Sequence, residues 1–407
     1  MPIATHIAAK SPLKISLRSV PHAALKAGCA LLMIAVLAGC STLSSLNPFA
    51  SKPEPRNVPA SLVEFSPSMN VRTAWTASIG SAGTFTFSPA VADGSLYAAG
   101  ADGTLARLDA ATGRDVWRIN AGMPLTAGVG ADGTTVAVAG AKGVLLAYDT
   151  EGRQRWKAQA SSEILSAPAV GQGLVVVRSV DNRIAAYDAE SGARKWVAQR
   201  PSPPLTLRTS PGIVISGQTA YVALPGGRLL ALAMSNGGAR WEIAVGDPRG
   251  TTELERIADV SGAPVISGNN VCAVSYQGRV GCFDTSNGAP RWAKELSSDV
   301  GLGIDERFVF AADERGTVTA FGRENGASAW RNNKLAHRRL STPVSFGRAV
   351  AVGDGQGYVH FLSREDGAFL ARVATDGSRI IAVSPQISGG NAIFQTQAGN
   401  VVALAAE

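Results

Sequence analysis

The sequence predicts an all-β protein, an eight-bladed β-propeller of four-stranded antiparallel blades. Two observations carry the prediction: a tryptophan recurs roughly every 40 residues, and each such unit holds short apolar runs separated by glycine turns. This pattern is typical of propeller blades, because one blade cannot bury its apolar faces alone and stacks on its neighbours. The tryptophans of the chain are Trp75, Trp117, Trp156, Trp196, Trp241, Trp292 and Trp330.

One complete unit, residues 88–117, shows how the four strands of a blade arise. Its apolar runs are too short for helices, and glycine-containing turns separate them, since tight hairpins need a backbone with positive φ. A recurring aspartate can bond its own backbone at the last turn, and the following glycine accepts a left-handed conformation, so the tryptophan strand begins at a fixed place. The runs are Pro89–Val91, Leu96–Ala99, Leu105–Leu108 and Val116–Ile119, and the last turn recurs as Asp109–Gly113–Trp117, Asp188–Gly192–Trp196 and Asp284–Gly288–Trp292.

Counting the units gives eight blades only if the two ends of the repeat array combine. Six units end in a tryptophan, and a seventh has Ala371 at that position. The last unit holds only three apolar runs, ending with Val401–Leu404, whereas Val71–Ile79 carries Trp75 without a blade before it. Pairing this N-terminal strand with the three C-terminal strands closes the ring within residues 71–407 and removes two free edges that would invite aggregation.

We expect the seven tryptophans to dock each blade against the next. The alternative is that some of them line a binding site. They recur once per unit instead of converging on one place, which favours packing. A buried indole covers about 200 Å² and contributes up to about 5 kcal/mol, so this packing would be a main source of stability.

The N-terminus has the features of a secretory signal peptide, predicted for residues 1–39. Basic residues such as Lys10 and Arg18 come first without any acid, and the apolar run Ala30–Ala38 follows. That run is too short for a permanent membrane helix. Residues 40–70 are rich in serine, asparagine and proline, which predicts an extended tether ahead of the propeller.

The four residues Leu37-Ala38-Gly39-Cys40 at the end of the apolar run resemble a bacterial lipobox. This resemblance implies cleavage before Cys40 and attachment of a diacylglyceryl group to its thiol, and Ser41 in the next position implies sorting to the outer membrane. The alternative for Cys40 is an ordinary buried thiol. The resemblance therefore predicts a protein anchored by lipid at the periplasmic face of the outer membrane.

The charge balance excludes one class of partner. The chain has 38 basic and 31 acidic residues, and four of the basic residues belong to the signal, so the mature chain carries 34 basic against 31 acidic residues. No basic run comes with the aromatic residues that a nucleic-acid groove needs. We expect no binding to nucleic acid.

Two cysteines remain after the signal, Cys272 and Cys282, on neighbouring strands joined by a turn at Gln277-Gly278. In an oxidising compartment they can pair across the hairpin. The alternative is two small buried thiols, because a difference of one residue in strand register decides whether the side chains face each other.

Motifs for catalysis and for metal binding are missing from the mature sequence. Its two histidines, His337 and His360, have no cysteine or acid at metal-ligand spacing. The sequence also lacks a nucleophile elbow and a phosphate loop. We therefore predict no catalytic residue, no bound metal, no cofactor and no enzymatic activity.

The repeat Leu-x-Ala-Leu/Tyr-Asp-x-x-x-Gly-x-x-x-Trp at 105–117, 145–156 and 184–196 resembles the tryptophan-docking repeat of pyrroloquinoline-quinone dehydrogenases, which are eight-bladed. Those enzymes bring adjacent cysteines, calcium-binding acids and a catalytic aspartate, whereas this chain has no vicinal cysteines. The resemblance implies the fold and not the chemistry. A dehydrogenase-like propeller stays as one alternative function, and a periplasmic glycan-binding propeller stays as another.

The lipobox, the tether and the eight repeats together resemble the BamB family, the lipoprotein subunits of the outer-membrane β-barrel assembly machinery. Two segments make the resemblance specific. Residues 204–208, Pro-Leu-Thr-Leu-Arg, followed by Ser210-Pro211, are similar to the family's Leu-x-Leu-Arg loop. Residues 250–260, Gly-Thr-Thr-Glu-Leu-Glu-Arg-Ile-Ala-Asp-Val, are similar to its Gly-Ser-Thr-Glu-Ile-Asp-Arg-Leu-x-Asp-Val segment.

In that family these surfaces contact the periplasmic POTRA domains of BamA. The resemblance implies contact residues here at Leu205, Leu207, Arg208, Glu253, Arg256 and Asp259. The family's second acid, two positions after Asp259, is Ser261 in this chain, so a charged contact is either missing or supplied by Glu253 or Glu255.

Spacing points to the same two segments without the comparison. The two longest tryptophan gaps are Trp196–Trp241 and Trp241–Trp292, which places extra residues in connections, where propellers usually bind partners. The alternatives are that Leu205 and Leu207 are inward residues of an irregular strand and that Arg208 and Asp259 form a solvated ion pair.

The resemblance thus implies a non-catalytic scaffold that binds BamA and other subunits of the assembly complex and supports the folding and insertion of β-barrel proteins. Direct contact with nascent outer-membrane proteins, by edge pairing or along the ring surface, is a further expectation.

Overall fold

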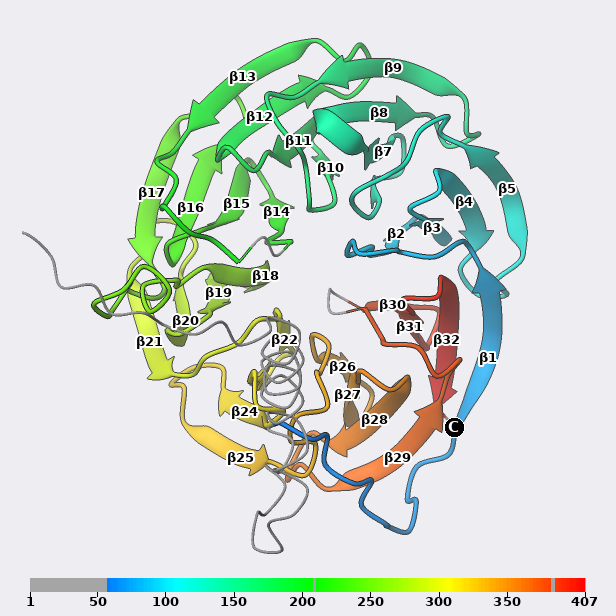
Figure 1. Cartoon of the computed structure of the whole chain (residues 1–407), viewed down its shortest axis with the longest axis vertical. Helices are drawn as coiled ribbons and strands as arrows, with labels where there is room; N and C mark the ends of the chain where they lie inside the picture. The colour runs from blue at the N-terminus through cyan, green and yellow to red at the C-terminus, as the bar shows by residue number, and fades with distance from the viewer. Residues whose placement is uncertain (1–56, 208–209, 382–384, 407) are drawn as a thin grey trace, which may run out of the picture. The chain divides into compact units, whose positions relative to one another are not determined.

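Eight four-stranded antiparallel sheets form a ring in the computed structural model, which describes residues 57–207, 210–381 and 385–406 (Figure 1). The compact unit runs over Pro59–Glu407. In the seven sheets that are continuous in sequence, the first strand lies nearest the centre of the ring and the last lies at the outside; in the eighth, β30 lies nearest the centre and β1 at the outside. The predicted eight-bladed propeller is confirmed.

Seven sheets are continuous in sequence, and their strands are short, as the apolar runs predict. The first four are β2–β5 (Ala90–Ala92, Ser95–Ala99, Thr104–Asp109, Asp115–Asn120), β6–β9 (Gly130–Ala131, Val136–Ala139, Val144–Tyr148, Gln154–Gln159), β10–β13 (Ala169–Gly171, Leu174–Arg178, Arg183–Asp188, Arg194–Gln199) and β14–β17 (Ile213–Ser216, Thr219–Leu224, Arg228–Ala233, Ala239–Ala244). The next three are β18–β21 (Val260–Ser267, Asn270–Ser275, Arg279–Asp284, Pro290–Glu295), β22–β25 (Leu302–Ile304, Phe308–Ala312, Val318–Gly322, Ser328–Asn332) and β26–β29 (Val344–Phe346, Ala349–Gly353, Tyr358–Ser363, Phe369–Ala374). One short 3₁₀ helix, η1 (Ala141–Gly143), precedes β8.

The eighth sheet joins the two ends of the described chain. Its order is β1-β32-β31-β30, with β1 at Val71–Ser78, β30 at Gln386–Ser388, β31 at Asn391–Gln395 and β32 at Asn400–Ala406. β1 runs antiparallel to β32, from Val71 opposite Ala406 to Ser78 opposite Asn400. The predicted closure is confirmed, and it leaves neither end as an unpaired strand edge.

The hydrophobic core lies between neighbouring blades. In one cluster Val176 and Ile184 of one blade pack with Val222 and Leu230 of the next, and Trp196 bridges them. The indole Nε1 of Trp196 donates to the carbonyl oxygen of Met234 at 2.7 Å. The same bond to the next blade joins Trp117 to Thr150, Trp156 to Ala189, Trp241 to Thr285, Trp292 to Arg323 and Trp330 to Arg364.

Each indole also covers the turn glycine of the following blade. A Cβ built on Gly237 would lie 2.5 Å from the Trp196 ring, so the turn must be glycine for the ring to approach. Trp75 packs on Gly113 in the same way, but its buried Nε1 has no hydrogen-bond partner among the described residues.

Ala371 replaces the tryptophan where the ring closes. It lies opposite Phe361, in the register that Trp330 has opposite Ala320. In the next blade the third and fourth strands are β32 and β1, two ends of the described chain, so no turn glycine exists there for an indole to cover. Met69, just before β1, is buried in the same core cluster as Ala371.

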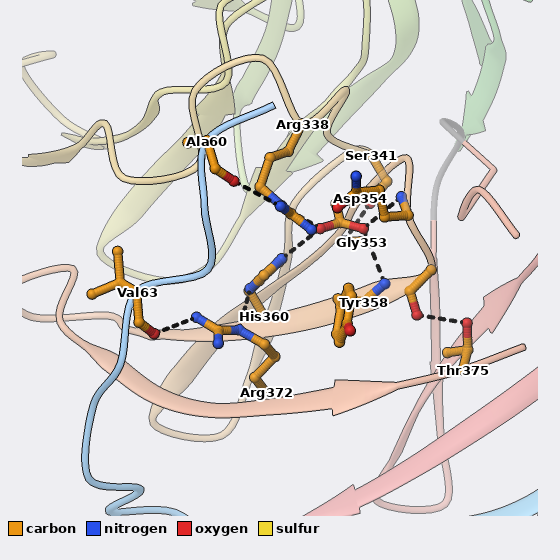
Figure 2. A network of polar contacts seen from close by, with 12 residues as sticks. Ala60, Val63, Arg338, Ser341, Gly353, Asp354, Tyr358, His360, Arg372 and Thr375 are labelled. Atoms are coloured by element: carbon orange, nitrogen blue, oxygen red, sulfur yellow. Dashed lines mark hydrogen bonds and ion pairs between the residues drawn. The ribbon is translucent and has the colours of Figure 1, made fainter. Parts of the chain in front are cut away.

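Residues 59–70, expected as the last part of the tether, pack along the β26–β29 blade (Figure 2). Arg338 donates to the carbonyl oxygen of Ala60 at 2.8 Å, and Arg372 donates to that of Val63 at 3.0 Å. The Phe65 ring stacks on Phe369 with centroids 5.3 Å apart. The compact unit therefore begins earlier than the composition predicts.

A buried polar network holds this segment (Figure 2). Asp354 Oδ2 accepts from Arg338 Nε at 2.7 Å and from His360 Nε2 at 2.9 Å, and Arg372 Nε donates to His360 Nδ1 at 3.2 Å. Because Nδ1 accepts, the imidazole is neutral with its proton on Nε2. Burial lowers the pKa of His360 by more than the bond to Asp354 raises it. Burial would raise the pKa of Asp354, but hydrogen bonds, first that from His360, hold it below its usual value.

Cys272 and Cys282 face each other on β19 and β20 and form a disulfide with their Cα atoms 4.0 Å apart. Both side chains are buried. The strand register thus places the two sulfur atoms on the same face of the sheet, which the sequence left open.

Candidate partner-binding site

The two longest connections between blades are consecutive ones, at the start and the end of the β14–β17 blade. They span 200–212 between β13 and β14 and 245–259 between β17 and β18. Both lie on the side of the ring that carries β13 to β18 (Figure 1). They contain the two segments singled out in the sequence. We refer to the exposed residues of these two connections as the docking surface.

Asp259, a buried residue at the end of the second connection, holds the first connection in place. Its side chain is 4% exposed, and its carboxylate accepts the backbone N–H of Leu207 at 2.7 Å on Oδ2 and that of Gly226 at 3.0 Å on Oδ1. The charge of Asp259 is thus used to hold the 204–207 segment against the β15–β16 turn. Its role as a direct partner contact stays a prediction, and the geometry gives it a supporting role first.

The first connection exposes apolar side chains. Leu205 is 42% exposed, and Leu207 is half-buried. Residues 201–207 form no strand, so the expectation of an irregular strand with two inward leucines does not describe this segment. Arg208, the fourth residue of the Leu-x-Leu-Arg motif, lies outside the described residues.

The second connection folds into a capped turn that presents Leu254. The N–H of Arg256 donates to the Thr252 carbonyl at 3.2 Å. Glu255 Oε2 accepts the backbone N–H groups of Thr251 and Thr252 at 2.8 and 3.0 Å, and these bonds, that from Thr252 first, lower the pKa of Glu255. Leu254 is 68% exposed. Leu254 was not among the contact residues predicted from the sequence, although an apolar residue at the centre of a polar turn itself indicates a contact.

Charge on this turn is carried by an exposed pair. Arg256 and Glu253 lie 3.4 Å apart with their side chains about half exposed. Such a pair contributes little to stability, so its groups can pair anew with a partner at small cost. Glu255, by contrast, is engaged within the turn.

Ser261 presents no charge at the position of the family's second acid. Its side chain is buried, and its hydroxyl donates to the Ser298 carbonyl at 2.7 Å, tying β18 to the β21–β22 connection. Both acids that were expected to supply the missing contact are exposed, but Glu255 Oε2 is bonded within the turn, which favours Glu253.

The described residues also bear on the remaining expectations. No group of three or more histidine, cysteine or acidic side chains within 57–207, 210–381 and 385–406 is placed to bind a metal ion. Over the same ranges, no helix has the length and apolar character needed to cross a bilayer. Cys40, the expected lipid attachment site, lies outside the described residues.

Comparison with known proteins decides the family. The family model described as "Outer membrane protein assembly factor BamB" matches residues 70–122 and 101–332. The protein of that name from Bordetella pertussis is 45% identical over 372 residues, which cover 91% of this chain and 96% of the relative. The chain belongs to the BamB family. The resemblance identified in the sequence is confirmed.

Other BamB proteins agree. The relative from Burkholderia pseudomallei is 43% identical over 369 residues, covering 90% of this chain and 94% of its own. The crystal structure of BamB from Moraxella catarrhalis superposes with a TM-score of 0.75 at 26% identity and covers 83% of this chain and 100% of that one. A quinohemoprotein alcohol dehydrogenase from Comamonas testosteroni superposes with a TM-score of 0.67 at 14% identity, over 82% of this chain and 76% of its own, a likeness that shows a shared fold only.

Proposed function

We propose that this chain is a non-catalytic scaffold in the assembly of outer-membrane β-barrel proteins, and that its docking surface binds the periplasmic POTRA domains of BamA. Several relatives with high coverage carry the name outer membrane protein assembly factor, which supports the first part. The exposed leucines of the two connections support the second.

The single observation that carries the docking proposal is the exposure of Leu205 and Leu254 at neighbouring connections. Exposing a large apolar side chain to water costs free energy. That free energy is recovered when a partner covers the side chain. Burying the exposed part of two leucines contributes on the order of 1–3 kcal/mol, which makes them candidates for the centre of an interface. Glu253 and Arg256 then lie at its charged rim.

Anchoring fits this role. With lipid on Cys40, the chain would be held at the periplasmic face of the outer membrane, where POTRA domains lie. The segment between Cys40 and Pro59, where the compact unit begins, spans at most roughly 65 Å when fully extended. The propeller would therefore stay close to the membrane surface while remaining outside it.

The scaffold mechanism follows from rigidity. The first connection of the docking surface is held by hydrogen bonds of Asp259, and the blades behind it are joined by indole hydrogen bonds, so little ordering is needed when a partner binds. Pairing of β1 with β32 closes the ring, so separating the first and last blades would require breaking a strand pair. Such a body can hold several POTRA domains in one arrangement without performing any chemistry.

The experiment is co-purification with BamA from detergent-solubilised membranes. The double variant Leu205→Asp/Arg208→Glu should lose BamA, because it places a negative charge at the exposed Leu205 and reverses the charge of the motif arginine. A matched control, Val116→Asp/Arg114→Glu, makes the same charge change at the start of β5, with Arg114 just before the strand and Val116, 53% exposed, within it. The control should retain BamA. Full retention by the first variant, with both proteins folded by circular dichroism, would remove this interface.

A further inference from the structure

A pocket of about 320 Å³ opens under the docking surface, beside the segment that carries Leu205. Apolar side chains form part of its lining, among them Leu165, Val180, Pro204 and Leu205. Two charged groups, Arg178 and Asp259, also line it. The pocket thus combines apolar side chains with a few charged groups, the usual composition of a binding site.

Arg178 is the unusual member. It ends β11 (Leu174–Arg178) and is 8% exposed. Its guanidinium has no hydrogen-bond or ion-pair partner in the described part of the chain, and the buried Nε is unsatisfied. Burial lowers the pKa of Arg178 to about 10, with Asp259 opposing the shift. The side chain is therefore still protonated at neutral pH.

Asp259 does not satisfy this cation. Both of its carboxylate oxygens already accept backbone N–H groups, from Leu207 and Gly226. Its charge lowers the cost of burying Arg178 through space, but the N–H donors of the guanidinium remain unused. A buried charge with unused donors costs free energy, which a matching acceptor can recover.

The geometry points to a glutamate side chain of the docked partner as the ligand of this pocket, an inference that rests on the proposed function. A carboxylate matches the planar fork of the guanidinium with two parallel hydrogen bonds. The two methylene groups of a glutamate suit the leucine and proline walls. A doubly charged phosphate fits less well, because Asp259 would repel the second charge.

Leu205 explains why the ligand would arrive on a partner and not as a free molecule. Leu205 lines the pocket and is also an exposed residue of the docking surface. A partner that covers Leu205 also seals the pocket from water, and in that dry setting the pair of Arg178 and glutamate is strengthened.

The test measures binding of the mature chain to detergent-solubilised BamA. Arg178→Met keeps the aliphatic stem and removes the charge, so it should raise Kd at least about 30-fold, the effect of truncating one partner of a buried charged pair. The midpoint of thermal unfolding should stay unchanged or rise, because an uncompensated buried charge is removed. A merely structural arginine would give the opposite pattern.

A matched control and a partner scan complete the test. Arg379→Met removes a half-buried arginine whose Nε is also unsatisfied, but in the β29–β30 connection, and it should leave Kd unchanged. In a panel of BamA with each POTRA glutamate changed to glutamine, one variant should bind weakly and show no further loss with Arg178→Met. Wild-type Kd for Arg178→Met, or additive losses across the whole panel, would overturn the inference.

The two proposals fail in different ways. If Leu205→Asp/Arg208→Glu loses BamA while Arg178→Met binds as the wild type, only the glutamate pocket is refuted. If neither variant changes Kd, the docking surface itself is refuted.

Discussion

Replacing Asp259 with asparagine should loosen the first connection of the docking surface without unfolding the propeller. The carboxylate makes two hydrogen bonds to partly buried backbone N–H groups, at 2.7 Å to Leu207 and 3.0 Å to Gly226. Asparagine keeps one acceptor oxygen and turns an NH₂ group toward the other N–H. One charge-assisted bond is then lost and one donor is left unpaired, a cost of about 2–3 kcal/mol.

The cost appears as local opening, because residues 201–207 have no strand pairing to hold them. A change of 2–3 kcal/mol corresponds to amide exchange roughly 30- to 150-fold faster at Leu207. Hydrogen exchange measured by mass spectrometry on peptides covering 200–207 and 224–227 tests this. Asp284→Asn, at the end of β20 where the carboxylate accepts the N–H of Ser286, should leave both peptides unchanged. Unaltered exchange at 200–207 in Asp259→Asn would refute the supporting role of the carboxylate.

Two further predictions concern stability. Trp196→Ala should lower the free energy of unfolding by about 3–5 kcal/mol, because it empties an inter-blade site and leaves the Met234 carbonyl without its donor; an unchanged denaturant midpoint would contradict this. The pKa of His360 is depressed in the fold, so its contribution is present above the usual value of 6.5 and is lost as pH falls below it, where the unfolded chain takes up the proton first. His360→Gln should therefore flatten the fall of the thermal midpoint between pH 7.5 and 5, and parallel curves for the two proteins would disprove the assignment.

The blade architecture was predictable because the same sequence pattern recurs in successive units. Apolar runs, turn glycines and one tryptophan per unit fix strand length, turn position and the face of each indole. Even the closure by β1 and β32 followed from counting strands, since one strand at the N-terminal end and three at the C-terminal end together make one four-stranded blade.

What the sequence could not give were contacts between distant residues. The proline-rich composition of residues 59–70 is typical of a tether, yet Arg338 and Arg372 bind its carbonyl groups from 278 and 309 residues further along the chain. Ala371 was a gap in the pattern. The structure explains it, because the third and fourth strands of the following blade, β32 and β1, are not joined by a turn that could supply the glycine.

The candidate site was predictable in location and less so in detail. Extra length in two connections and the family resemblance pointed to residues 200–212 and 245–259. The burial of Asp259, the exposure of Leu254 and the unpaired guanidinium of Arg178 depend on how separate loops pack. The pairing of Cys272 with Cys282 depends on a one-residue register that composition does not encode.

Site-specific photo-crosslinking in intact cells tests the central claim most directly. A photoreactive residue at Leu205 or at Leu254 should yield a crosslink to BamA, whereas the same residue at Val116 should not. Absence of a BamA crosslink from both leucine positions, with the protein present at its normal level, would contradict the docking surface proposed for this chain.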